Sequence, residues 1–144
     1  MRVICAADAH VPHDVLALLS LLGIPVERSY FAATSDGLGD IGRGDIMLLD
    51  LRRHPRQAID TIKSIRRRQG FGPGIIVMTR RGDVVITLEA LEAGADSLTH
   101  CPGTDATLVA ASIIGLGRLM GVLPQGVRVH RGVCQTGSGC GAIP

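Results

Sequence analysis

The sequence predicts a doubly wound α/β fold, in which one parallel β-sheet is covered by helices on both faces. Three observations support this. Short apolar runs alternate with longer amphipathic segments along most of the 144 residues. These runs are apolar at nearly every position, as in strands that are buried on both faces. Glycine and proline separate the segments. Such alternation favours parallel pairing with right-handed crossovers, and places a functional site at the carboxyl ends of the strands.

Each element has its own signal. The first helix begins at Pro12 and stops at Gly23. The second has an apolar stripe and ends in three arginines, which complement the helix dipole. The third is closed by Gly94, and the glycine-rich segment 34–44 allows only a short or irregular helix. Strands are therefore expected over residues 3–6, 24–31, 46–49, 75–78 and 97–99, and helices over 12–22, 55–68, 84–93 and 104–120.

One domain is expected over residues 1–123, followed by a glycine-rich tail or truncated linker over 124–144. The first residues lack the long apolar core of a secretory signal. The longest apolar region, 108–123, is interrupted by Arg118 and is shorter than the roughly 20 residues that cross a bilayer. A cytoplasmic protein without a membrane span is therefore expected.

Charge and cysteine content exclude further classes. The net charge of +2 is too small to indicate direct nucleic-acid binding. Cys5 lies in an apolar run and is expected in the core. Cys134 and Cys140 flank a glycine-rich segment at a spacing that is unusual for zinc, so their role stays open.

Polar side chains follow four of the predicted strands. Carboxylates brought together at one sheet edge repel one another, and a hard cation such as Mg²⁺ relieves that repulsion. The side chains concerned are Asp8 and His10 after the first strand, Asp50 after the third, Thr79 and Arg80 after the fourth, and His100, Cys101 and Pro102 after the fifth.

This order resembles the receiver domain of two-component response regulators, over residues 1–120, and so implies a flavodoxin-like (βα)5 fold. The segment ALEAGADSL, residues 90–98, is very similar to the phrase that the family carries there. The resemblance implies that Asp50 is the phosphoacceptor and Thr79 the switch residue. It also implies a Mg²⁺ site at Asp8, Asp50 and Arg52, a histidine kinase or other signalling protein as partner, and a signalling module rather than an enzyme.

The chain also departs from the family pattern. Ala7 stands where receivers have their first acid, and Cys101 where they have a lysine. Lys63, on the predicted helix 55–68, is the only lysine of the chain and cannot replace it. Leu98 stands where an aromatic residue is common. We therefore expect an atypical, pseudo-receiver-like domain with weakened Mg²⁺ binding and impaired or absent phosphorylation, unless Arg52 or Arg80 supplies the missing charge.

Other interpretations stay open. A competent receiver would accept phosphate on Asp50 from a histidine kinase. A ligand- or redox-sensing module would use His100 and Cys101, or the arginines 52, 53, 56 and 66–68 as a phosphate-binding group. The ordinary interpretations are a solvated loop acid for Asp50, a helix cap for Asp8 and turn chemistry for Thr79.

The last predicted helix has no charge between Asp105 and Arg118, and its apolar residues occur on all sides. A helix that covers a sheet should have a polar outer face. Either the tail covers this helix, or it forms an interface. We expect a homodimer built from the helices 84–93 and 104–120 with the strand 97–99, in which the interface residues are Leu108, Ile113, Ile114 and Leu116.

Overall fold

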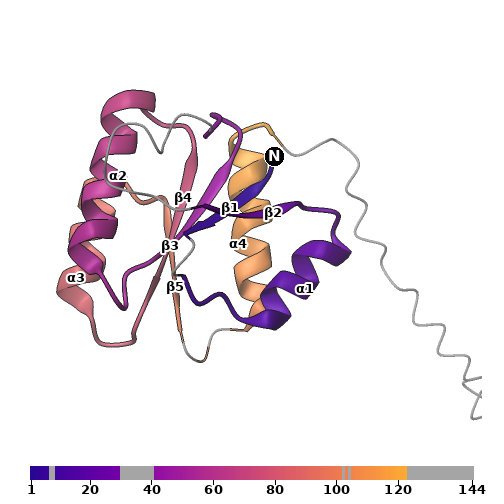
Figure 1. The fold of residues 1–144 in the computed structure, drawn as a ribbon, viewed down its shortest axis with the longest axis horizontal. Coiled ribbons are helices and arrows are strands. Elements are labelled where there is room, and N and C mark those ends of the chain that lie inside the picture. Colours follow the sequence, from indigo (N-terminus) through magenta and orange to yellow (C-terminus); the bar gives the residue numbers. More distant parts are fainter. Residues whose placement is uncertain (7–8, 30–40, 102, 104, 123–144) are drawn as a thin grey trace, which may run out of the picture.

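The computed structural model describes residues 1–6, 9–29, 41–101, 103 and 105–122. Its five strands form one parallel sheet in the order β2-β1-β3-β4-β5, which confirms the predicted fold class (Figure 1). The strands are β1 (Val3–Ala6), β2 (Val26–Ser29), β3 (Ile46–Asp50), β4 (Gly74–Thr79) and β5 (Ser97–His100). The helices are α1 (His13–Leu21), α2 (Pro55–Gln69), α3 (Val84–Ala93) and α4 (Ala106–Leu119).

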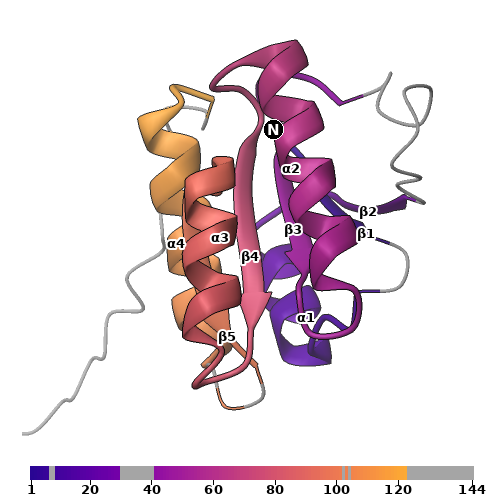
Figure 2. The ribbon, with the colours of Figure 1, turned by 90° about the vertical axis from the view of Figure 1, so that its left-hand side faces the viewer.

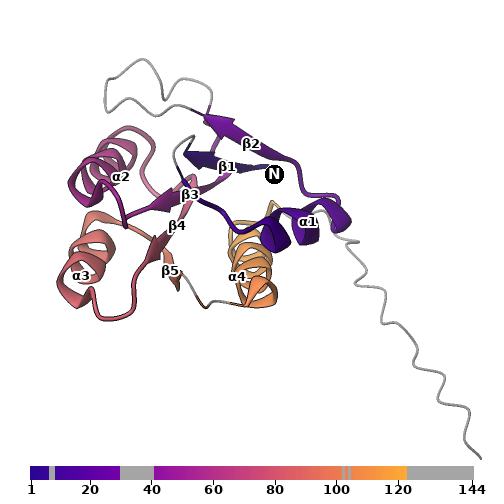
Figure 3. The same ribbon diagram turned by 60° about the horizontal axis from the view of Figure 1, so that its bottom comes forward.

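The helices form a layer on each face of the sheet. Helices α1 and α4 lie on one face, and α2 and α3 on the other (Figure 3). All residues of β1 and β4 are buried, as are the first four of β3. Strands covered on both faces have no solvent-facing side, which explains why these runs are apolar throughout.

Helix α2 follows the predicted pattern closely. It begins with Pro55, whose fixed φ and missing N–H suit the first turn of a helix. Ile59, Ile62 and Ile65 are spaced on one face and are buried against the sheet. The stripe therefore holds α2 on its face of the sheet.

Helix α4 places the side chain of Leu116 directly over Gly74 of β4. Its amino end is capped by Asp105, whose Oδ1 accepts a hydrogen bond from the Thr107 N–H at 2.8 Å. A Cβ at Gly74 would lie 2.6 Å from Leu116 Cδ2 and 2.8 Å from Met120 Sδ, so a larger residue there would displace these side chains. The buried face of α4 consists of Val109, Ala110, Ile113 and Gly117.

The expectation that Ile113 belongs to an interface is wrong, because its side chain is completely buried against the sheet. Ile114 and Leu116 are half-buried and pack against the same core. Of the four residues, only Leu108 is largely exposed, at 63%. An apolar helix without a polar face gives no signal of which side turns inward, which is why the sequence could not separate these residues.

Some expectations fall outside the described residues: those on Ala7, Asp8 and Pro102, on most of the segment 34–44, and on the tail with Cys134 and Cys140. Within the described ranges, none of the helices has both the length and the apolar character needed to cross a bilayer.

Candidate functional site at the carboxyl edge of the sheet

Asp50 is the last residue of β3, and the strand brings it to the edge where Thr79 and His100 end their own strands. The strand register pairs Asp50 with Met78, and Thr79 with His100. In Figure 2 the arrows of β3 and β4 point toward this edge. The sequence placed Thr79 and His100 just after their strands, whereas both close them. Each strand is one residue longer there because it continues the parallel pairing.

The Asp50 carboxylate is held by the side chain of Arg52, two residues later. Arg52 Nε donates to Oδ1 at 2.8 Å and Nη2 donates to Oδ2 at 2.7 Å, which is the two-pronged geometry that guanidinium and carboxylate favour. The Arg52 backbone N–H adds a bond to Oδ1 at 3.0 Å. The side chains are only 4% exposed for Asp50 and 13% for Arg52, so the pair is largely shielded from water.

The same arginine ties the loop after β1 to this acid. Arg52 Nη2 also donates to the His10 carbonyl oxygen at 3.0 Å, and the His10 N–H donates to Asp50 Oδ2 at 3.3 Å. His10 was expected near this edge, but the role of its backbone was not. A side-chain pattern cannot reveal a contact that is made through main-chain atoms.

These contacts set the ionisation of Asp50. Burial alone would raise the pKa of its carboxyl, but the hydrogen bonds and charge of Arg52, together with the His10 N–H, outweigh burial and hold the pKa below its usual value. The pKa of Arg52 is raised in turn, chiefly by its hydrogen bond to Asp50. The two groups therefore stay charged and paired at neutral pH.

Thr79 is buried, and its Oγ1 lies 3.1 Å from His100 Nδ1. Which of the two donates depends on the histidine tautomer. The sequence indicated both residues separately but not this contact, which follows from their direct pairing across β4 and β5.

Cys101 follows β5, is buried, and donates its backbone N–H to the Thr79 carbonyl oxygen at 2.8 Å. It lies close enough to Arg52 to interact with it electrostatically. Arg80, the other arginine considered as a source of charge, is exposed. The structure therefore brings Arg52, and not Arg80, to the acid.

The predicted Mg²⁺ site stays a prediction, and a cation bound at Asp50 would have to displace the Arg52 guanidinium. Both oxygens of Asp50 already accept hydrogen bonds from Arg52, and a guanidinium group repels a cation and has no lone pair to offer it. Asp8 lies outside the described residues. Across the described part of the chain, no group of three or more His, Cys, Asp and Glu side chains is placed to hold a metal ion.

No protein-family model matches the chain. The transcriptional regulatory protein FixJ from Azorhizobium caulinodans is 32% identical over 112 residues, which cover 77% of this chain and 52% of FixJ. The chain thus spans about half the length of this curated relative.

Solved structures share the fold at lower identity. A two-component response regulator from Clostridium difficile superposes with a TM-score of 0.65 at 21% identity, over 82% of this chain and 95% of that one. The receiver domain of NtrX from Brucella abortus gives a TM-score of 0.64 at 16% identity, over 82% and 98%. The sheet order, the sequence match and these shared folds agree: the chain belongs to the receiver-domain family of two-component response regulators.

Proposed function

We propose that this receiver domain acts in signal transduction through protein–protein contacts, and that phosphorylation of Asp50 is impaired. The observation that carries the proposal is the two-pronged contact of Arg52 with Asp50, at 2.8 and 2.7 Å. Both carboxylate oxygens are engaged by it, and the side chain is nearly closed to an incoming phosphodonor. Asp50 thus keeps the position of a phosphoacceptor without its accessibility.

The contact between Arg52 and Asp50 opposes phosphoryl transfer to Asp50. A carboxylate oxygen must offer a lone pair to phosphorus while positive charge neutralises the equatorial oxygens of the transferring group. Cys101, at the lysine position, supplies no fixed positive charge. Arg52 is the nearest cation, and it is committed to Asp50 and to the His10 carbonyl. The lowered pKa also makes the carboxylate a weaker nucleophile.

The experiment is incubation of the full chain with Mg²⁺ and acetyl phosphate, followed by intact-mass measurement. We expect no adduct on the natural chain and a gain of adduct in the double variant Arg52→Ala/Cys101→Lys. Adding Asp50→Asn to the double variant should remove the adduct. Arg53→Ala, which alters the exposed neighbour of Arg52, is the matched control and should give no gain. An adduct on the natural chain that Asp50→Asn abolishes would contradict the proposal.

The rival function is a competent receiver that accepts phosphate on Asp50 from a histidine kinase. The ionised state of Asp50 and the position of Thr79 on the neighbouring strand favour it. In this case Arg52 must swing from the carboxylate onto the phosphoryl oxygens. The mass experiment decides between the two functions, because only the rival predicts an adduct on the natural chain.

A homodimer through α3, β5 and α4 is the second part of the proposal. It is supported by a set of exposed apolar side chains on α3, together with Leu108 on α4. The side chains on α3 were not identified as interface residues from the sequence. Exposed apolar groups gathered on one face favour a protein interface. The α3 side chains are Val84, Leu88 and Leu91, which lie three or four residues apart and so share one side of the helix.

Sedimentation tests the dimer. The double variant Leu88→Glu/Leu108→Glu should lower the mass to that of a monomer, because it places two charges in the proposed contact. Leu21→Glu alters an exposed leucine of α1 and should leave the mass unchanged. A natural chain that sediments as a monomer would remove this part of the proposal.

A ligand- or redox-sensing module is the remaining alternative. Cys101 is buried, which gives a metal ion or an oxidant little access to its thiol, and His100 Nδ1 is already in contact with Thr79. We therefore place this function behind the other two. A cytoplasmic location is part of the same proposal.

A further inference from the structure

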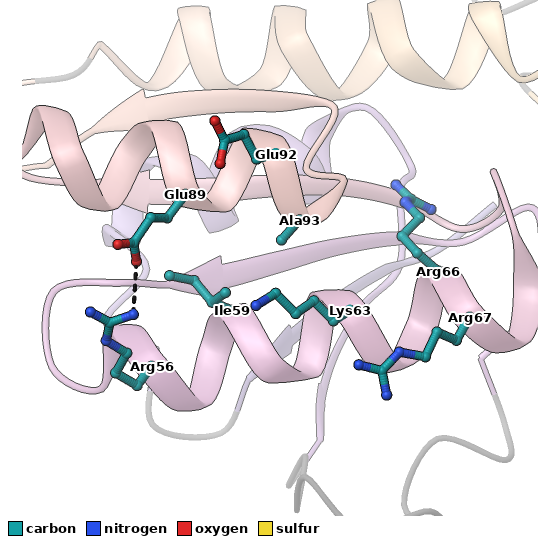
Figure 4. A pocket seen from close by; sticks show the side chains of 8 residues that line it. All are labelled: Arg56, Ile59, Lys63, Arg66, Arg67, Glu89, Glu92 and Ala93. Atoms are coloured by element: carbon teal, nitrogen blue, oxygen red, sulfur yellow. Dashed lines mark hydrogen bonds and ion pairs between the residues drawn. The ribbon is translucent and has the colours of Figure 1, made fainter.

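We propose that the groove between α2 and α3 binds an amphipathic helix of a partner protein, with an acidic edge of that helix lying along α2. The groove has a volume of about 690 Å³ (Figure 4). It shares no residue with the Asp50 cluster or with the apolar set on α3 and α4. Its lining residues are Arg56, Ile59, Lys63, Arg66 and Arg67 from α2, and Glu89, Glu92 and Ala93 from α3.

The charges of the groove are separated by side. Every charged lining residue of α2 is basic, and every charged lining residue of α3 is acidic. Arg56 Nη1 donates to Glu89 Oε2 at 3.0 Å and so joins the two helices at one end. Arg66 is committed to Asp96 and to main-chain carbonyls. Lys63 and Arg67 are exposed, so their charges are available to a ligand.

The orientation of these two side chains argues against a small anion. Lys63 extends along the groove toward Ile59, whereas Arg67 points away from α3 (Figure 4). The two cations therefore do not converge on one point, as a phosphate would require. They can instead meet successive acids along an elongated ligand.

Two other occupants fit less well. A nucleic acid would bring its phosphates against Glu89 and Glu92 on the α3 side. A second copy of this chain would place one concave groove against another and leave a void between them. A single helix, about 10 Å across with its side chains, is convex and fills a groove.

Apolar contact for such a helix comes mainly from Val85 at the end of the groove, because Ile59 in the floor is only 3% exposed. Ile59 and Ala93 lie between the charged sides (Figure 4). Val85, one turn before Glu89 on the same side of α3, is 68% exposed and continues this apolar line. A helix with leucines on one face and acids along one edge matches this apolar end and the α2 side together.

The test uses the full chain and a synthetic amphipathic peptide with a leucine face and a glutamate edge. A second peptide with lysines at the glutamate positions is its control. We expect saturable binding of the first peptide, with backbone amide shifts in NMR spectra confined to residues 56–67 and 85–93. Lys63→Glu/Arg67→Glu should weaken binding at least about tenfold. Arg80→Glu/Arg81→Glu makes the same charge change at an exposed turn and should weaken it less than about twofold.

Four outcomes would overturn the inference: no saturable binding, equal binding of the lysine-edged peptide, shifts on another face, or an equal loss in the control variant. Tighter binding of duplex DNA than of the peptide would assign the groove to a polyanion instead. Should the charge-reversed variant unfold, Lys63→Gln/Arg67→Gln provides the same comparison. No phosphodonor is present, so the result is independent of whether Asp50 can be phosphorylated.

Discussion

Two arginines hold aspartates at opposite edges of the sheet. At the carboxyl edge, Arg52 directs both prongs of its guanidinium to Asp50. At the amino edge, Arg66 gives Asp96 a single bond at 2.7 Å and directs its other donors to the carbonyl oxygens of Gly94, Gly70 and Pro73. Arg66 thereby joins the end of α2, the turn before β4 and the turn before β5.

The two aspartates differ in exposure and in the number of groups that share their charge. Asp96 is 32% exposed and also accepts the Ile75 N–H, so it works as one part of a junction between turns. The side chain of Asp50 is 4% exposed, and its negative charge is balanced almost entirely by one side chain, that of Arg52. Similar chemistry therefore joins three turns at one edge and, at the other, engages both oxygens of the acid for which we propose impaired phosphorylation.

Removing Arg66 should give the largest loss of stability. Arg66→Ala leaves three carbonyls and Asp96 without their partner, and we expect the free energy of unfolding to fall by about 2–3 kcal/mol in urea titrations. Arg67→Ala, at the exposed neighbour, should change it by less than about 0.5 kcal/mol. Equal effects of the two variants would show that the amino-edge junction contributes little.

The Asp50–Arg52 pair should show a smaller coupling. In a double-mutant cycle of Asp50→Ala and Arg52→Ala, we expect a coupling free energy of about 1–2 kcal/mol, because removing one partner leaves the other shielded and unpaired. The exposed Arg56–Glu89 pair is the matched reference and should give less than about 0.5 kcal/mol. A coupling for Asp50 and Arg52 no larger than this reference would mean that the arginine is only loosely held.

Acid should remove the contribution of Asp50. Its folded pKa is lowered, so the stabilisation is present above the unfolded value of about 4 and is lost as the pH falls through the folded pKa. The difference in unfolding free energy between the natural chain and Asp50→Asn should therefore shrink between about pH 6 and pH 3. A difference that grows on acidification would contradict the assigned direction of the shift.

The sheet and the place of Asp50 could be predicted because both depend on local pattern. Fully apolar runs indicate buried parallel strands, and Asp50 directly follows one of them. The two-residue spacing of Asp50 and Arg52 in a strand-to-helix turn was the available signal for their contact. It was not sufficient, because the arginine is also positioned by the His10 carbonyl from a loop 42 residues away in sequence.

Other features depend on close approach, which a sequence does not show. Gly94 was predicted as a helix stop, and it does follow α3 with φ at +113°. A Cβ there would also lie 2.7 Å from Arg66 Cγ, so this glycine additionally makes room for the arginine at the amino edge. Gly74 likewise leaves room for the Leu116 and Met120 side chains of the α4 region, which a Cβ there would meet at 2.6 and 2.8 Å.

The bond from Arg52 to the His10 carbonyl links the Asp50 site to the segment that precedes α1. An event that draws Arg52 away from both Asp50 and this carbonyl removes one of the bonds that position the segment 9–12, which leads directly into α1. That segment holds a second bond to the same acid through the His10 N–H. A disturbance at Asp50 is therefore linked to α1 by hydrogen bonds, on the face of the sheet that α1 shares with α4 and opposite to the groove between α2 and α3.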